Sequence, residues 1–182
     1  MPVFDIDAAF AYYAKHIHRQ ERFDLLEEHH FEVAGSIPSI DWELFGAILT
    51  GDDRKPGYGS DLKDHEVKSA VEGSSFEYQY HRHGGLAKLD EDKTVDHVFV
   101  SYAPDYKRVT VRLVDRSKLA SIFESWREGL VQNYQGTTPK QRYRKSIAYG
   151  TVTREGEIIL RIEGSRLVQA QGILPASPEP ED

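Results

Sequence analysis

Residues 59–70 read GSDLKDHEVKSA, and we expect this stretch to form two short strands joined by a tight turn. Glu66 and Lys68 are two positions apart on the second strand, so their side chains leave the same face of the sheet. Asp61 ends the first strand and can meet them across the turn. Val67 points the other way, into the sheet. The sequence therefore predicts two carboxylates and one ammonium group at a single point of the fold.

The regions around this stretch predict helices first and then a run of strands. Apolar residues recur at helical spacing in some segments, while β-branched and aromatic residues mark others as strands. In chain order we expect helices over 5–28 and 40–49, a loop over 51–60, strands over 58–62, 65–71, 74–81, 95–102 and 108–114, a helix over 117–131, and strands over 145–153 and 157–163 around a hairpin turn at 154–156. This order predicts an α/β fold with a central mixed β-sheet flanked by helices.

Length and composition are those of an ordinary globular protein. The chain has 182 residues, and we expect 1–170 to form one domain and the proline-rich, acidic tail 171–182 to be disordered. It has no cysteine, which excludes disulfides and thiolate metal sites. No apolar run approaches the roughly 20 residues that a membrane span needs. The acidic N-terminus does not resemble a secretory signal, so we expect a cytoplasmic protein.

The formal net charge of -7 is unevenly distributed. Residues 107–166 hold 13 Lys/Arg and 6 Asp/Glu, whereas residues 1–106 hold 10 Lys/Arg and 21 Asp/Glu. The basic half could bind phosphates while the acidic half gathers divalent cations. The alternative is the ordinary fluctuation of charge along a chain.

Two carboxylates beside a lysine are the groups that phosphodiester hydrolysis requires. Carboxylate oxygens suit Mg²⁺, which takes one or two of them and keeps several waters. The ion polarises a phosphoryl oxygen and lowers the pKa of its bound water. A lysine beside it can orient or deprotonate the attacking water and neutralise charge on the phosphate. The alternative is a solvated hairpin with ordinary surface charge.

The stretch resembles the PD-(D/E)XK nuclease motif, with Asp61 as the first acid and residues 66–68 as the second half. Ser60 stands where the family name has proline. These nucleases often carry a further acid on a preceding helix, and Glu43 offers one. The resemblance covers roughly residues 39–114, and type II restriction endonucleases are the most similar group.

The resemblance implies a role for each of these residues. Asp61 and Glu66 would hold Mg²⁺, and Lys68 would position the nucleophilic water. Glu43 would assist the metal or the structure, although an acid near the start of a helix is often only a partner of the helix dipole.

Two basic segments are candidates for contact with DNA. Lysine and arginine would contact phosphates, and arginine or glutamine could read base edges. His81 and His83 would share a strand face, but no third ligand accompanies them, so we expect no zinc site. The alternative for both segments is a solvated turn. The candidate DNA-binding residues are Lys140, Gln141, Arg142, Tyr143, Arg144, Lys145, His81, Arg82 and His83.

The sequence thus predicts a type II restriction endonuclease that cuts double-stranded DNA with Mg²⁺. A duplex has two scissile phosphates, so a homodimer follows by symmetry. Phe10, Tyr12 and Tyr13 are either a dimer surface or, as we expect, part of the core. Two alternatives stay open, namely another nuclease of the superfamily (repair, nicking or modification-dependent) and a non-catalytic DNA-binding domain on the same fold. No phosphate-binding loop for a nucleotide cofactor is present.

Overall fold

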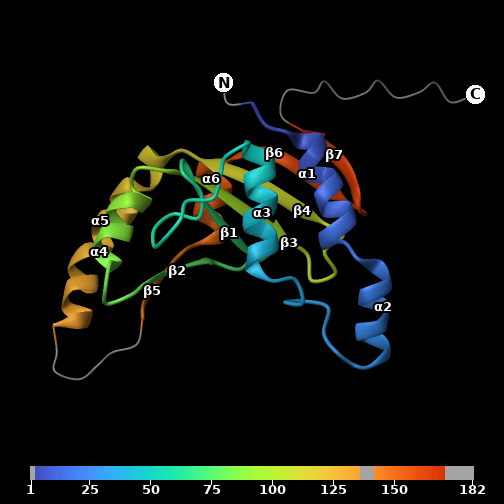
Figure 1. Ribbon diagram of the computed structural model, residues 1–182, viewed down its shortest axis with the longest axis horizontal. Coiled ribbons are helices and arrows are strands. Elements are labelled where there is room, and N and C mark those ends of the chain that lie inside the picture. The colour runs from blue at the N-terminus through green and yellow to red at the C-terminus, as the bar shows by residue number, and fades with distance from the viewer. Residues whose placement is uncertain (1–2, 136–141, 171–182) are drawn as a thin grey trace, which may run out of the picture.

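A five-stranded sheet of order β1-β3-β4-β6-β7 forms the centre of the protein (Figure 1). The computed structural model describes residues 3–135 and 142–170. β1 runs parallel to β3, and the other neighbours are antiparallel. β2 and β5 form a separate antiparallel pair. The strands are β1 (His65–Val71), β2 (Phe76–Tyr80), β3 (Asp96–Tyr102), β4 (Val109–Val114), β5 (Tyr143–Ile147), β6 (Glu157–Glu163) and β7 (Arg166–Ala170).

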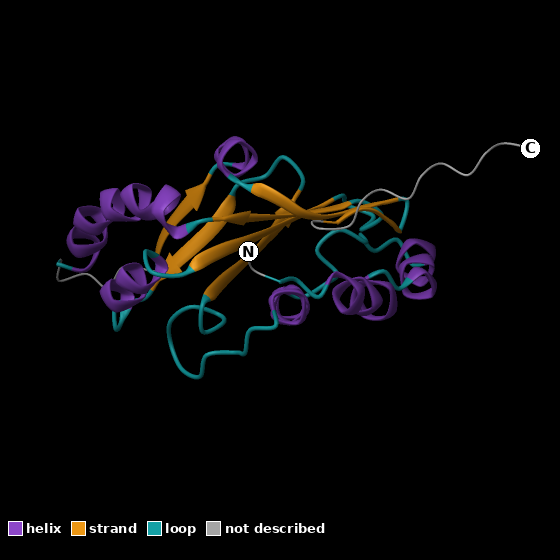
Figure 2. Ribbon diagram, turned by 90° about the horizontal axis from the view of Figure 1, so that it is seen from above, coloured by secondary structure: helices purple, strands orange, loops and turns teal. Residues whose placement is uncertain are grey.

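Helices cover both faces of this sheet, which confirms the predicted mixed α/β architecture (Figure 2). One face carries the N-terminal helices, and the other carries α4, α5 and the β2–β5 pair. Within the described residues, no helix has the length and apolar character needed to cross a membrane. The helices are α1 (Ile6–Tyr12), a π-helical turn (Tyr13–Ile17), α2 (Gln20–Glu28), α3 (Ser39–Thr50), α4 (Gly85–Asp92), α5 (Arg116–Tyr134) and α6 (Tyr149–Glu155).

The first core lies between the sheet and the N-terminal helices α1 to α3. Val98 and Val100 contribute to it from β3. Trp42 of α3 stacks on Tyr102 with ring centroids 5.2 Å apart, and Tyr102 stacks on Tyr106 at 4.9 Å. These stacked rings fix α3 against the sheet.

The second core lies on the opposite face, under β2, α4, α5 and β5. Phe99 points into it from β3, because side chains alternate along a strand. Tyr78 of β2 packs edge-on against Phe123 of α5, with ring centroids 5.2 Å apart. β3 is thus buried on both faces, which explains the apolar run Val98–Val100 at its centre.

Phe10, Tyr12 and Tyr13 pack into the first core, as expected. Tyr13 is fully buried, and its hydroxyl donates to the carbonyl of Tyr106 at 2.7 Å. Phe10 and Tyr12 are partly buried against the same cluster.

Seven predicted elements are confirmed, each to within three residues at its ends. Their patterns are local and strong. They are the helices predicted at 40–49 and 117–131 and the strands predicted at 65–71, 74–81, 95–102, 108–114 and 157–163.

The strand predicted at 58–62 is wrong. This segment is a loop with a single antiparallel bridge between Arg54 and Leu62. Gly57 has a φ of +97°, which breaks an extended run. Amide groups of the loop donate to carboxylates on α4 and β1 in place of a neighbouring strand. The loop is therefore fixed by side chains.

The single helix predicted over 5–28 is interrupted. After a π-helical turn, His18 and Arg19 leave the helical region with ψ of 77° and 82°. The His18 ring packs on Tyr13, and its Nε2 lies 3.1 Å from Ser165 Oγ in the β6–β7 connection. This long-range contact explains a break that helical periodicity could not indicate.

The strand predicted over 145–153 is also wrong. Its first residues belong to β5, and the rest form α6. β5 pairs with β2, whereas β6 pairs with β4, so the chain must cross from one sheet to the other. α6 makes that crossing.

The hairpin turn predicted at 154–156 lies elsewhere. It joins β6 to β7 at Gly164 and Ser165, whose φ angles are +56° and +64°. Positive φ at both central residues is typical of a tight hairpin turn whose twist matches that of its strands. β7 and α4 are elements that the sequence did not predict. The tail 171–182 lies outside the described residues.

Candidate active site

Glu66 and Lys68 share a face of β1, as the alternation predicted. Lys68 Nζ lies 2.5 Å from Glu66 Oε1. Val67 points to the first core, where it meets α3 at Gly46. A Cβ added at Gly46 would lie 2.6 Å from a Val67 methyl group, so the close approach of α3 to β1 requires glycine there. The helix that carries Glu43 is thereby held against the strand that carries the acid and the lysine.

Asp61 joins them from the loop rather than from a strand. Its backbone N–H donates to Glu66 Oε2 at 2.9 Å, and its own Oδ2 accepts from the backbone N–H of Val67 at 3.2 Å. Lys68 Nζ lies 3.7 Å from the same Oδ2. These reciprocal contacts bring the three predicted residues together despite the missing strand.

Lys88 of α4 is a fourth charged residue of the site, which the sequence did not indicate. Its Nζ lies 2.9 Å from Glu66 Oε1, 3.2 Å from Asp92 Oδ1 and 2.9 Å from the carbonyl oxygen of Gly59. Its side chain is 9% exposed. Two ammonium groups, those of Lys68 and Lys88, therefore share one carboxylate oxygen.

A buried network continues behind Lys88. Tyr80 donates its hydroxyl to Asp92 Oδ2 at 2.7 Å. His97 Nε2 lies 2.8 Å from the Asp92 carbonyl oxygen, and its Nδ1 lies 2.8 Å from the Tyr78 hydroxyl. Burial lowers the pKa of His97 to about 4, so this ring is neutral near pH 7. The network links α4, β2 and β3 behind the charged residues.

The two lysines determine the ionisation of Glu66. Burial alone would raise the pKa of this fully buried carboxyl, but the charges and hydrogen bonds of Lys68 and Lys88 lower it to about 2. Burial would lower the pKa of Lys68, but the charges of Glu66 and Asp61 raise it. Lys68 is therefore a cation near neutral pH, suited to orienting water or binding phosphate rather than to accepting a proton.

The two remaining carboxyls of the site have raised pKa values. Burial raises the pKa of Asp61, with Lys68 opposing and Glu66 adding to the shift. Burial, and then the charge of Asp61, raises the pKa of Glu43. The effect of Asp61 on Glu43 places the predicted helix acid close to the site. A carboxylate with a raised pKa is the better proton acceptor.

The charged side chains of the site line a pocket of about 290 Å³. Asp61, Glu66, Lys68 and Lys88 come from the loop, β1 and α4, and the opposite wall comes from β2. The lining residues are Gly57, Tyr58, Gly59, Asp61, Glu66, Lys68, Glu77, Gln79, His81 and Lys88.

Two of the predicted DNA-binding arginines contact residues that line this pocket. Arg144 on β5 is the cross-strand partner of Gln79, and its Nη1 lies 3.9 Å from Glu77 Oε2. Arg142 Nη1 donates to Gln79 Oε1 at 2.8 Å. Both arginines are exposed. The β2–β5 pair thus presents cations beside the pocket.

The other predicted residues of that segment lie differently. Tyr143 is turned toward α5, where its hydroxyl donates to the Trp126 carbonyl oxygen at 3.3 Å. Lys145 is exposed, with its Nζ 5.6 Å from the Tyr143 ring centroid. Lys140 and Gln141 lie outside the described residues.

The predicted histidine segment follows β2, which ends before His81. The expectation that His81 and His83 share a strand face is therefore wrong. His81 lines the pocket, and its ring meets Tyr58 edge-on at 5.4 Å. Arg82 lines a smaller apolar pocket of about 170 Å³ that also includes His81. His83 is exposed.

Asp61 is better placed than Glu66 to bind a divalent cation. In residues 3–135 and 142–170, three or more His, Asp or Glu side chains nowhere gather as a metal-binding set. Mg²⁺ needs only one or two carboxylates. The Asp61 side chain is 22% exposed toward solvent and fits this role. Both oxygens of Glu66 already accept hydrogen bonds, so Glu66 fits only if an ammonium group withdraws.

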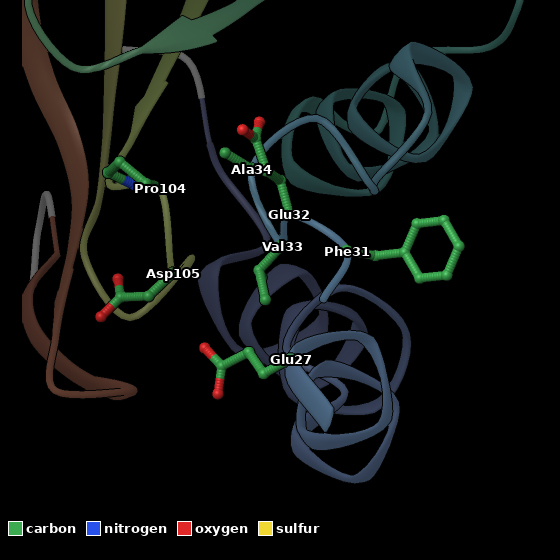
Figure 3. Close-up of a pocket in the computed structure, with 7 residues that line it drawn as sticks. All are labelled: Glu27, Phe31, Glu32, Val33, Ala34, Pro104 and Asp105. Carbon is green, nitrogen blue, oxygen red and sulfur yellow. The ribbon is translucent and has the colours of Figure 1, made fainter. Parts of the chain in front are cut away.

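A second pocket, of about 330 Å³, lies away from this site, between the end of α2 and the β3–β4 connection (Figure 3). Glu27 and Asp105 come from opposite sides of it, and the Phe31 ring extends away from the other lining residues. Its charged lining is acidic, without a lysine, arginine or histidine, so it offers nothing to bind a phosphate. The lining residues are Glu27, Phe31, Glu32, Val33, Ala34, Pro104 and Asp105.

In comparisons with known proteins, no model of a protein family matches the chain, and no curated protein matches it.

Proposed function

We propose that the chain is a Mg²⁺-dependent endonuclease that hydrolyses phosphodiester bonds of double-stranded DNA. The observation that supports this most is the convergence of Asp61, Glu66 and Lys68 at one pocket, with Glu43 close by. This is the acid–acid–lysine set of the PD-(D/E)XK resemblance. The departure is that Asp61 comes from a loop instead of a strand.

The chain's own groups would divide the chemistry among them. Lys68 is a cation beside the pocket and would bind the non-bridging phosphate oxygens or orient the attacking water. Asp61 would hold Mg²⁺, which when bound supplies charge for the phosphate and a more acidic water. Glu43, with its raised pKa, is the group that could accept the water's proton.

A DNA strand is the substrate that the pocket's surroundings favour. Arg144 on β5 and Arg142, which directly precedes that strand, contact residues that line the pocket and could pair with backbone phosphates on either side of the one being cleaved. Since these arginines now pair with Gln79 and Glu77, DNA would exchange those partners for phosphates. The net charge of -7 does not oppose this, because the distribution of charge matters more than its sum, and residues 107–166, which include both arginines, hold 13 of the 23 Lys/Arg.

Within this proposal, a cytoplasmic type II restriction enzyme acting as a homodimer is the specific form that the sequence favours. Another nuclease of the superfamily would use the same groups. A non-catalytic DNA-binding domain is the candidate from a different class. Against it stands the burial of Glu66 and Lys88 beneath the pocket, an arrangement that costs stability and that DNA binding alone does not need.

Incubation of the full chain with plasmid and long phage DNA, modified and unmodified, with and without Mg²⁺, tests the proposal. We expect Mg²⁺-dependent cleavage. Discrete fragments would favour a restriction enzyme, and a smear would favour a less specific nuclease. DNA binding without cleavage of any of these substrates would contradict the enzyme and leave the binding domain.

A further inference from the structure

A carboxylate that binds a metal ion needs a free oxygen. At Glu66 the ammonium group of Lys88 takes up that place. The Lys88 nitrogen lies 2.9 Å from Glu66 Oε1, the oxygen that also faces Lys68. The other oxygen, Oε2, accepts the backbone N–H of Asp61. Neither oxygen of this fully buried carboxylate is left for an added ion.

Lys88 is itself firmly held. Besides Glu66 it contacts Asp92 and the carbonyl oxygen of Gly59, so all three of its ammonium protons have acceptors. Asp92 is fixed in turn by the Tyr80 hydroxyl. Displacing Lys88 would leave two buried carboxylates with less compensation, which is unfavourable.

Asp61 differs from Glu66 in the same site. Its Oδ2 accepts a backbone N–H and faces Lys68 at 3.7 Å, but its side chain is 22% exposed. Among the described residues, no hydrogen bond to its Oδ1 is recorded. The two carboxylates are therefore unequal as ligands.

We propose that Lys88 is a resident cation of this site, which occupies Glu66 and thereby directs a divalent ion to Asp61. Lys88 is then a positioning residue, and Glu66 orients Lys68 and the Asp61 loop without ligating the ion. This inference rests on the proposed metal-dependent function and specifies how the same site takes its metal. It departs from the expectation that Glu66 is a metal ligand.

Titration of the full chain with Mn²⁺, with the free ion counted by electron paramagnetic resonance, tests this. Mn²⁺ accepts the same carboxylate and water ligands as Mg²⁺. We expect Lys88→Met to tighten Mn²⁺ binding at least about fivefold or to add a second bound ion, because Glu66 Oε1 then has one ammonium neighbour, Lys68, instead of two. Lys55→Met is the matched control. It removes a cation that pairs with Glu91 of α4 beside the same loop, and we expect a change of less than about twofold.

Two double variants with the wild-type net charge separate ligation by Glu66 from a simple change of charge. The gain should persist in Lys88→Met/Asp92→Asn, which keeps Glu66, and should disappear in Lys88→Met/Glu66→Gln, which lacks the ligand. Unchanged or weaker binding in a folded Lys88→Met protein would overturn the inference, as would a gain that persists in Lys88→Met/Glu66→Gln. If Lys88→Met does not fold, Lys88→Met/Asp92→Asn removes the carboxylate left without its cation, and the same gain is expected.

The outcome is distinguishable from failure of the proposed function. A gain of Mn²⁺ affinity in Lys88→Met, with no DNA cleavage by the wild-type chain, would support the role of Lys88 and contradict the nuclease. Cleavage by the wild-type chain with no such gain would support the nuclease and overturn the role of Lys88.

Discussion

The two cores of this protein are built from different chemistry. The first core, under α1 to α3, consists of apolar and aromatic side chains, with Trp42 stacked on Tyr102 at its centre. The second core, under α4 and α5, includes the buried charges of Glu66, Lys88 and Asp92. Buried charges seldom add stability over well-packed apolar groups. The difference indicates that the first core mainly stabilises the fold, whereas the second also supports a site.

The sheet itself shows the same division. Glu66 and His97 are cross-strand partners and therefore point to the second core. Ser101 lies two alternations further along β3 on that face, and Arg112 is the partner of Phe99. All the buried polar side chains of the described sheet strands thus share one face.

Among variants that compare the two cores, the largest effect is expected when the site loses the half-buried cation of Lys68. Lys68→Met should reduce DNA cleavage by on the order of 100- to 1,000-fold, because it removes the charge that faces the phosphate. The melting temperature should also fall, because the buried carboxylate of Glu66 loses one of its two ammonium partners, so the loss of cleavage is expressed per folded molecule. Single-turnover cleavage measures the loss. Lys63→Met, which removes a lysine paired with Asp53 on the surface, should cleave like the wild type.

In the first core, a substitution should lower stability and leave the cleavage rate nearly unchanged. Phe23→Ala should lower the free energy of unfolding by about 3–5 kcal/mol, because it leaves a cavity beside Tyr106. Urea denaturation measures this. The cleavage rate per folded molecule should be nearly unchanged at low temperature. A large loss of the folded enzyme's rate would contradict the separation of the two cores.

The sequence predicted the features that depend on local structure and missed those that depend on long-range contacts. The common face of Glu66 and Lys68 was predictable because it depends only on alternation along β1. Asp61 was expected at the site for the wrong reason, since side chains and not a strand hold its loop. Lys88 was missed because α4 is eight residues long and begins beside Gly84, which gave no clear helical pattern. Only the tertiary fold brings it to Glu66.

A smaller effect, with a defined pH window, is expected at Asp92. Burial raises the pKa of this carboxyl to about 6 from 3.8, so the folded state binds more protons than the unfolded state between these pH values. Wild-type stability should therefore fall as pH rises through this window. Asp92→Asn does not titrate, and its stability relative to wild type should increase by on the order of 1–2 kcal/mol from pH 4 to pH 6.5. Urea denaturation across this range measures the difference. A difference independent of pH would contradict it.

The smallest effect is expected at Arg144, the exposed arginine of β5. Arg144→Gln should weaken DNA binding equally for different sequences and lower the slope of log affinity against log salt by about 1, because one phosphate contact is lost. Fluorescence anisotropy at several salt concentrations measures the slope. Arg166→Gln, on the distant strand β7, is the control. An unchanged slope in Arg144→Gln would exclude this arginine from the DNA interface.

The account depends most directly on Asp61. Its backbone N–H bonds to Glu66 and its carboxylate faces Lys68 only in the folded protein, and the proposed metal site is built on that carboxylate. The decisive measurement is Mg²⁺-dependent cleavage of the same DNA by the wild type and by Asp61→Asn, with DNA binding measured in parallel. The account predicts cleavage by the wild type, none detectable by Asp61→Asn, and similar DNA affinity for both. Equal cleavage by both proteins would contradict it.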